Sequence, residues 1–199
     1  MEFSEVVRRR KMVQVFEQTP VDPAVLDRLL DTARRGPSAG FSQGSDFLVL
    51  DRPDTVARFF ELTDDPEFPN DPDDLATGPT VIVIFLSDPG KYLARYSAPD
   101  KIQFGLDRAE AWSAKFWDTD TAMGCMLFLL AAVDAGLGGW LFGIPYGEAA
   151  VRAEFGIPDD RNVISVIGLG HPGVDDAPKG SAYSLSRRPL DEMVHRNGW

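Results

Sequence analysis

The sequence predicts an α+β protein in which helices cover both faces of a sheet of four or five strands. Thr80 to Leu86 and Asn162 to Ile167 are continuous apolar runs rich in β-branched residues, which is typical of strands buried on both faces. Asp22-Pro23 followed by a stripe of leucines predicts an amphipathic helix, because Asp caps helix N-termini and proline favours the first helical position. Strands buried on both faces need helices on each side of the sheet, which sets the class.

The other elements follow from the same patterns. Helices are expected at residues 4–11, with Ser4 as N-cap, and at 22–36, 55–62, 100–117, 121–135 and 148–155. Strands are expected at 47–50, 80–86, 140–142 and 162–167, with a strand-like piece at 12–16. The segments 36–44 and 64–74 are rich in turn-forming and acidic residues, so they are predicted to be exposed loops, and the acidic one could form a lid.

The segment Thr121 to Ala135 is apolar on nearly every side, with Met123, Met126, Leu127 and Leu130 among its residues. A surface helix carries a polar stripe, so a helix without one is expected to be fully buried. Burial between two subunits satisfies this pattern, which favours a dimer.

Composition limits the classes of partner and compartment. The chain has 199 residues, a length suited to a single domain, with 31 acidic and 20 basic residues and a formal charge of −11. That charge repels phosphate backbones and anionic lipid, so neither nucleic acid nor a membrane is expected as a partner. The one cysteine cannot form an intramolecular disulfide, and the N-terminus has no apolar signal core, so a cytoplasmic location is expected.

Several familiar site patterns are present only in part. Gly168 to Gly173 matches the G-x-G-x-x-G pattern, but Pro172 and Pro178 follow where a helix would have to begin, so a strand-ending turn is predicted instead of a dinucleotide site. The two histidines, His171 and His195, have no metal-ligand spacing, so no metal site is expected. Cys125 lies in an apolar segment, which favours an inert buried thiol over a nucleophile.

The basic start of the chain is more informative. Arg8 to Lys11 supplies four cations directly before the strand-like piece, and Arg187 and Arg188 lie near the end. Converging arginines are the usual partners of a phosphate, whereas an isolated basic helix face is commonly just solvated. Both interpretations remain open on these residues alone.

Five motifs, in order, resemble the nitroreductase family. The segment from Val6 to Val21 (VVRRRKMVQVFEQTPV) resembles its basic opening, and Pro37 to Gln43 (PSAGFSQ) its P-S-x-x-x-x-Q loop. Asp118 to Gly138, Glu154 to Pro158 with Gly168 to Pro172, and Ser186 to Leu190 resemble its central helix, its closing helix and strand, and its basic tail. The resemblance covers nearly the whole chain and implies a mixed sheet flanked by helices in an intertwined homodimer, with FMN at the subunit interface.

The resemblance also assigns residues to the cofactor. Arg10, Lys11 and Met12 would lie along the FMN phosphate and ribityl chain, and Gln14 stands where the family usually has Arg or Lys. Arg187 or Arg188 would complete the phosphate site. The loop residues Pro37, Ser38, Ala39 and Gly40 would approach the flavin from the partner subunit, with Phe41 in place of a common polar residue. Backbone N–H groups of Gly143 or Ile144 would face the flavin N5 and O4 edge.

The implied activity is that of an FMN-dependent oxidoreductase. Hydride from NAD(P)H would pass to the flavin, and a nitroaromatic, quinone or flavin acceptor would then take the electrons in a ping-pong cycle; no protein residue is assigned a catalytic role. Candidates for an aromatic wall of the substrate site are Phe41, Trp112, Phe116, Trp117 and Tyr146. The alternatives are a specialised relative, such as a biosynthetic oxidase or dehydrogenase or a flavin-fragmenting enzyme, a flavin-binding protein without turnover, and a relative that has lost flavin.

Overall fold

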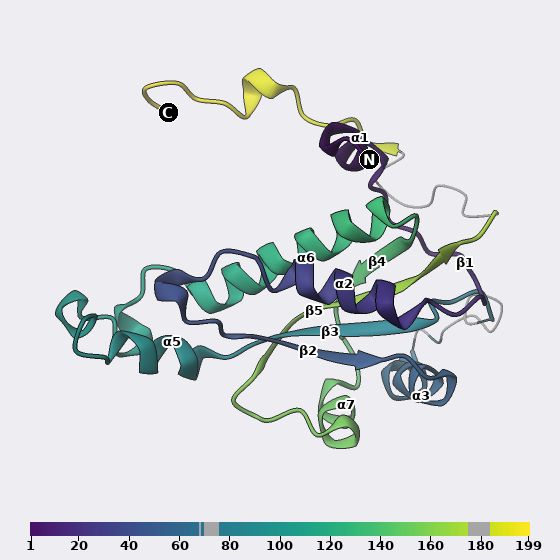
Figure 1. Cartoon of the computed structure of the whole chain (residues 1–199), viewed down its shortest axis with the longest axis horizontal. Coiled ribbons are helices and arrows are strands. Elements are labelled where there is room, and N and C mark those ends of the chain that lie inside the picture. The colour runs from purple at the N-terminus through teal and green to yellow at the C-terminus, as the bar shows by residue number, and fades with distance from the viewer. Residues whose placement is uncertain (68, 70–75, 175–183) are drawn as a thin grey trace.

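A five-stranded sheet forms the centre of the protein. The computed structural model describes residues 1–67, 69, 76–174 and 184–199 (Figure 1). The strands are β1 (Phe16–Glu17), β2 (Ser45–Leu50), β3 (Val81–Ser87), β4 (Gly138–Phe142) and β5 (Asn162–Pro172), in the order β1-β5-β3-β2 with β4 also paired to β5. All four pairings between these strands are antiparallel, and the described residues add one parallel bridge, between Met12 and Gly139.

Helices cover both faces of this sheet, as predicted. Alternate residues of β3 face opposite sides: Val81, Val83 and Phe85 pack with α2 (Pro23–Ala33) and α6 (Phe116–Asp134), whereas Ile82, Ile84 and Leu86 pack with α3 (Pro53–Thr63) and α7 (Glu148–Phe155). Figure 1 shows α2 and α6 together on one side of the strands and α3 and α7 on the other. The α+β class is thereby confirmed.

Local capping chemistry explains where several helices begin. Asp22 caps α2 by accepting the backbone N–H of Ala24 at 2.8 Å, as its sequence predicts. Asp88 caps α5 (Pro89–Tyr96) in the same way through the N–H of Lys91. The predicted N-cap Ser4 is wrong: α1 (Phe3–Arg9) begins after Glu2, which makes no side-chain capping bond.

The segment before α6 differs from the prediction. In place of a helix over 100–117, two short 3₁₀ turns occur at Ile102–Phe104 and Ala109–Ala111, and α6 begins at Phe116. Gly105 lies between the turns with φ 64°, a left-handed conformation that ends a helical segment. The predicted acidic loop is described only at 64–67 and 69, because the rest of it lies outside the described residues.

The G-x-G-x-x-G pattern lies within and directly after β5 rather than in a turn, because the strand continues to Pro172. Its glycines are explained by close packing: a Cβ at Gly168 would come within 2.7 Å of Pro79, and one at Gly170 within 2.9 Å of Phe16. Among the described residues the motif runs through the end of β5 into Gly173, so no helix N-terminus lies within it, which is consistent with the rejection of a dinucleotide-binding turn.

Two terminal segments lie outside the sheet and its helices. Figure 1 shows α1 and the C-terminal segment, residues 184–199, beyond the main body. The helix α6 is long and apolar enough, by length and composition, to cross a membrane, but it packs on the sheet as a core helix and is buried along 44% of its most apolar window. One side of α6 remains exposed, and Phe116, Met123 and Met126 lie on it.

Candidate functional site

The basic opening of the chain divides into two parts. Arg8 and Arg9 both pair with Glu5, at 2.7 and 2.5 Å, and hydrogen bonds from the two guanidinium groups lower the pKa of that carboxyl. Arg10 is half-buried and ends α1, donating its backbone N–H to Val6 O at 3.0 Å. Arg8 and Arg9 therefore form a paired surface cluster on the helix, and Arg10 and Lys11 lead into the next segment.

That next segment is held against β4. Val13 donates its N–H to Gly139 O at 3.1 Å, and Met12 Sδ accepts the N–H of Leu141 at 3.4 Å. Val13 is buried against Gly138, where a Cβ would come within 2.7 Å of its side chain. Because side chains alternate along an extended segment, Met12 and Gln14 face outward, where both are exposed.

The loop 36–44 is held by its own hydrogen bonds and by α6. Ser38 Oγ accepts the N–H of Gln43 at 2.8 Å, and Asp120 Oδ2 accepts the N–H of Ala39 at 2.8 Å. Gly40 has φ 62° and lies so close to Tyr96 that a Cβ there would come within 2.7 Å of the ring. The backbone of the predicted cofactor loop is thus fixed in one conformation.

Tyr92 and Arg95 of α5 brace the same loop. Tyr92 donates its hydroxyl to Asp120 Oδ2 at 2.8 Å, and burial raises the pKa of Tyr92, which keeps this donor protonated. Arg95 Nε donates to Gly40 O at 3.0 Å while its other nitrogens pair with Asp100 at 2.9 and 2.7 Å. The hydrogen bond from Arg95 lowers the pKa of Asp100 to about 2, so the carboxylate is ionised and pairs with Arg95 at neutral pH.

A cavity of about 550 Å³ opens beside this loop. Pro37, Ser38, Phe41 and Asp120 line it, together with Arg34 and Arg35 at the end of α2, both of which pair with Asp31. Sequence reasoning predicted Pro37 and Ser38 but missed Arg34, Arg35, Asp120 and the bracing residues of α5. The signal available for α5 was Asp88-Pro89, which repeats the Asp-Pro helix start of α2.

The remaining predicted residues lie elsewhere. Gly143 follows β4 and is exposed, and a Cβ built on it would meet no atom within 4 Å. Ile144 is half-buried and its side chain packs into the core between α3 and α7, so only its backbone can face a ligand. Arg187 and Arg188 are exposed on the C-terminal segment, and Arg188 donates to Glu192 O at 2.9 Å.

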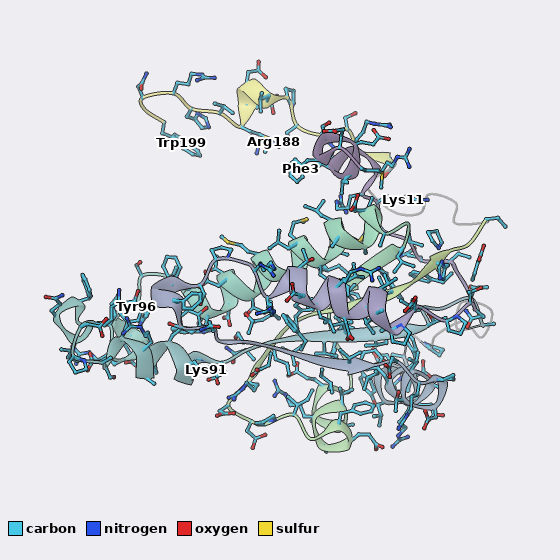
Figure 2. All side chains as sticks on the ribbon, in the orientation of Figure 1. Phe3, Lys11, Lys91, Tyr96, Arg188 and Trp199 are labelled. Atoms are coloured by element: carbon cyan, nitrogen blue, oxygen red, sulfur yellow. The ribbon has the colours of Figure 1, made fainter. Side chains whose placement is uncertain are left out.

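Within one chain, these groups do not meet. The loop contacts α6 at Asp120, whereas Val13 is hydrogen-bonded to Gly139, just beyond the end of α6 at Asp134, and the fourteen residues from 120 to 134 span about 21 Å of helix. Figure 2 shows Lys11 and Tyr96, the latter beside the loop, at opposite ends of the body. The predicted cofactor residues of a single chain therefore lie in two separate groups, one near each end of α6.

Other chemistries find little support among the described residues. No group of three His, Cys, Asp or Glu side chains that could hold a metal occurs in the part of the chain the structure describes. Cys125 is buried and lies 3.0 Å from Ser165 Oγ, and burial raises the pKa of its thiol to about 11. At neutral pH that thiol is protonated, which makes it a poor nucleophile.

A family model described as the nitroreductase family matches residues 7–171, which include the loop 36–44, β1 to β4 and β5 up to His171. The chain belongs to the nitroreductase family. The family resemblance predicted from the sequence is thus confirmed, and it extends across the N-terminal segment, the fixed loop and all five strands.

Relatives with similar names or structures match along almost their full lengths. A protein of Archaeoglobus fulgidus named as an NADH dehydrogenase/NAD(P)H nitroreductase is 23% identical over 98% of this chain and 97% of its own length. A Bacillus subtilis nitroreductase structure has a TM-score of 0.77 at 18% identity, covering 98% of both chains. A Desulfovibrio desulfuricans nitroreductase, crystallised with FMN, has a TM-score of 0.70 at 18% identity, covering 100% of this chain and 98% of that one.

Proposed function

We propose that this nitroreductase-family protein is an FMN-dependent oxidoreductase that uses NAD(P)H and works as a homodimer. Bound FMN would supply the redox chemistry, taking hydride at N5 and passing electrons to a nitroaromatic, quinone or flavin acceptor in a ping-pong cycle. The observation that carries the proposal is the fixed loop 36–44 beside its cavity, because this loop is the family segment expected at the flavin.

The residues present fit FMN in size and charge. A volume of about 550 Å³ lies within the roughly 300–1,000 Å³ typical of cofactor pockets. The exposed main chain at Gly143 leaves room for a flat ring to approach, because no atom occupies the position of a Cβ there. Arg10 and Lys11 supply cations to a phosphate, and Met12 lies next to them on the segment held by β4.

The chain's own residues would bind and orient the cofactor. Arg10 and Lys11, with Arg187 or Arg188, would hold the phosphate. Pro37, Ser38, Ala39 and Gly40 would contact the ring system from the partner subunit, and the N–H groups of Gly143 or Ile144 would donate to its N5 and O4 edge. N–H donors and cations near a flavin stabilise negative charge on its reduced form. Gln14, an uncharged residue, would contribute hydrogen bonds without adding to that positive field.

The homodimer is supported by the separation of the two groups of predicted cofactor residues and by the exposed side of α6. Residues 12–13 lie beside Gly139, just beyond the C-terminal end of α6, and loop 36–44 contacts α6 at Asp120 near its other end, so a second copy would bring the two segments together. Met123 and Met126 are 45% and 46% exposed on α6, and Leu127 and Leu130 beside them are half-buried. A second copy would cover this face and bring its own loop to the first chain's cationic segment.

Anaerobic absorbance spectroscopy tests the proposal. The purified protein is loaded with FMN, freed of excess cofactor, and mixed with NADH or NADPH and then with menadione. Flavin bands that bleach with one nicotinamide and return with the quinone are the expected result. Bands that persist would favour a specialised relative or a flavin-binding protein without turnover, and protein that retains no flavin would overturn the proposed function.

A further inference from the structure

The five aromatic residues predicted as candidates for a substrate wall lie in different parts of the structure. Trp112 and Trp117 lie in a cluster of aromatic rings, with their ring centroids 5.8 Å apart. The Trp112 ring also packs on that of Tyr96, at a centroid distance of 4.7 Å. Phe116 packs against the same cluster, with its ring centroid 5.8 Å from that of Trp112. These rings stabilise the fold, and neither they nor Tyr146 line the cavity beside loop 36–44, whereas Phe41 does.

Phe41 combines exposure with a costly backbone conformation. Its side chain is 76% exposed, and among the described residues no ring contacts it. Its φ is 56°, in the left-handed region that side chains other than Gly, Asn and Asp seldom adopt. An exposed apolar ring contributes little to stability, so nothing in the folding of this chain favours phenylalanine at this position.

The surrounding loop enforces this conformation. Phe41 donates its N–H to Ser38 O at 2.8 Å, and Ser42 Oγ donates to Ala39 O at 2.7 Å. Arg95 holds the preceding carbonyl of Gly40. The backbone on each side of Phe41 is therefore fixed, which also fixes the position of the Phe41 Cα and Cβ atoms at the cavity. Strained residues held by well-ordered surroundings cluster at ligand sites.

We propose that Phe41 is a specificity-determining residue whose ring stacks on the planar electron acceptor at the flavin. This role rests on the proposed function and deepens it, because the fixed loop would carry Phe41 to the partner subunit's flavin. Offset stacking on a flat ring selects planar aromatic acceptors over compact non-planar ones. Phe41 acts by binding the flat ring and takes no part in electron transfer itself, so the rate of flavin reduction at saturating NAD(P)H does not depend on it.

The test compares Phe41→Asn with wild type in the FMN-loaded dimer. Asparagine adopts the left-handed conformation readily, so the melting temperature should stay within about 2 °C of wild type or rise. The KM for menadione should rise about tenfold, with little change for ferricyanide, a non-planar acceptor. The limiting rate of flavin reduction at saturating NAD(P)H in stopped flow should not change. Phe41→Trp should restore a low KM for menadione.

The other possible results would contradict a stacking role for Phe41. An unchanged KM for menadione in Phe41→Asn, with normal flavin content, would overturn the stacking role and leave the proposed function intact. Equal losses with menadione and ferricyanide, a slower limiting rate of flavin reduction at saturating NAD(P)H, or dissociation into monomers in analytical ultracentrifugation would assign Phe41 to general packing and overturn the role as well. Wild-type protein that binds no FMN would overturn both proposals together.

Discussion

Tyr92 and Asp120 join two helices to the loop 36–44: the Tyr92 hydroxyl donates to Asp120 Oδ2 at 2.8 Å, and the same oxygen accepts the N–H of Ala39 at 2.8 Å. Tyr92 comes from α5 and Asp120 from α6, and both are buried. One carboxylate oxygen thus fixes the position of the loop relative to both helices.

Replacing Asp120 with alanine should destabilise the protein and weaken cofactor binding together. The substitution leaves the Tyr92 hydroxyl and the Ala39 N–H without their acceptor, and each stranded donor costs about 1–3 kcal/mol. We expect the free energy of unfolding, measured in urea, to fall by about 2–4 kcal/mol, with a parallel loss of FMN affinity in fluorescence titration. The exposed neighbour Thr119→Ala is the matched control, and equal losses in both variants would contradict this role.

Tyr92 makes stability depend on alkaline pH. Burial raises the pKa of Tyr92 above its ordinary value of 10.0. The folded state therefore holds the Tyr92 proton more tightly than the unfolded state. The stabilisation that results is complete below pH 10 and is lost as the pH rises through the pKa of the folded state. Tyr92→Phe should be less stable than wild type in urea at pH 8, and the difference should shrink at pH 11. A difference that is independent of pH would contradict this linkage.

The sequence was sufficient for the parts of the fold that local chemistry and periodicity determine. β3 and β5 were predicted because strands buried on both faces are apolar throughout, and α2 because Asp22 caps it. The segment 100–117 was mispredicted as a helix, whereas in the structure Trp112 packs in a cluster with Tyr92 and Tyr96. Such tertiary packing overrides local preference and leaves no periodic signal.

The site was predictable only as far as the family motifs extend. Pro37 and Ser38 were found because they belong to a motif, whereas Asp120 acts through a hydrogen bond between residues 81 positions apart, which no spacing rule reveals. In the proposed dimer the two groups of cofactor residues would meet only through a second chain, and a single sequence carries only the indirect sign of an all-round apolar helix.

Arg10 and Arg8 should differ in their importance for FMN. Arg8 is paired with Glu5 and is exposed, whereas Arg10 is half-buried at the start of the segment held by β4. Losing one hydrogen bond to a charged phosphate costs about 1.5–3 kcal/mol, so Arg10→Gln should raise the Kd for FMN by at least about tenfold. Arg8→Gln should change it less than about twofold. Equal increases in the Kd of the two variants would mean that Arg8 to Lys11 attract FMN only through their summed positive charge. A Kd unchanged in both variants would mean that the phosphate binds elsewhere.

A charge on the exposed face of α6 should separate the subunits and remove the cofactor. Met126 is 46% exposed on this face, and Met126→Glu would place a carboxylate against the partner's apolar surface, where an unpaired charge is strongly unfavourable. We expect a monomer in analytical ultracentrifugation, with helical circular dichroism retained and FMN binding lost. Ala57→Glu, at an exposed position of α3 on the opposite face of the sheet, should remain a dimer and keep its flavin. A Met126→Glu monomer that still binds FMN would show that one chain completes the site alone, and an intact dimer would show that the subunits meet through another surface.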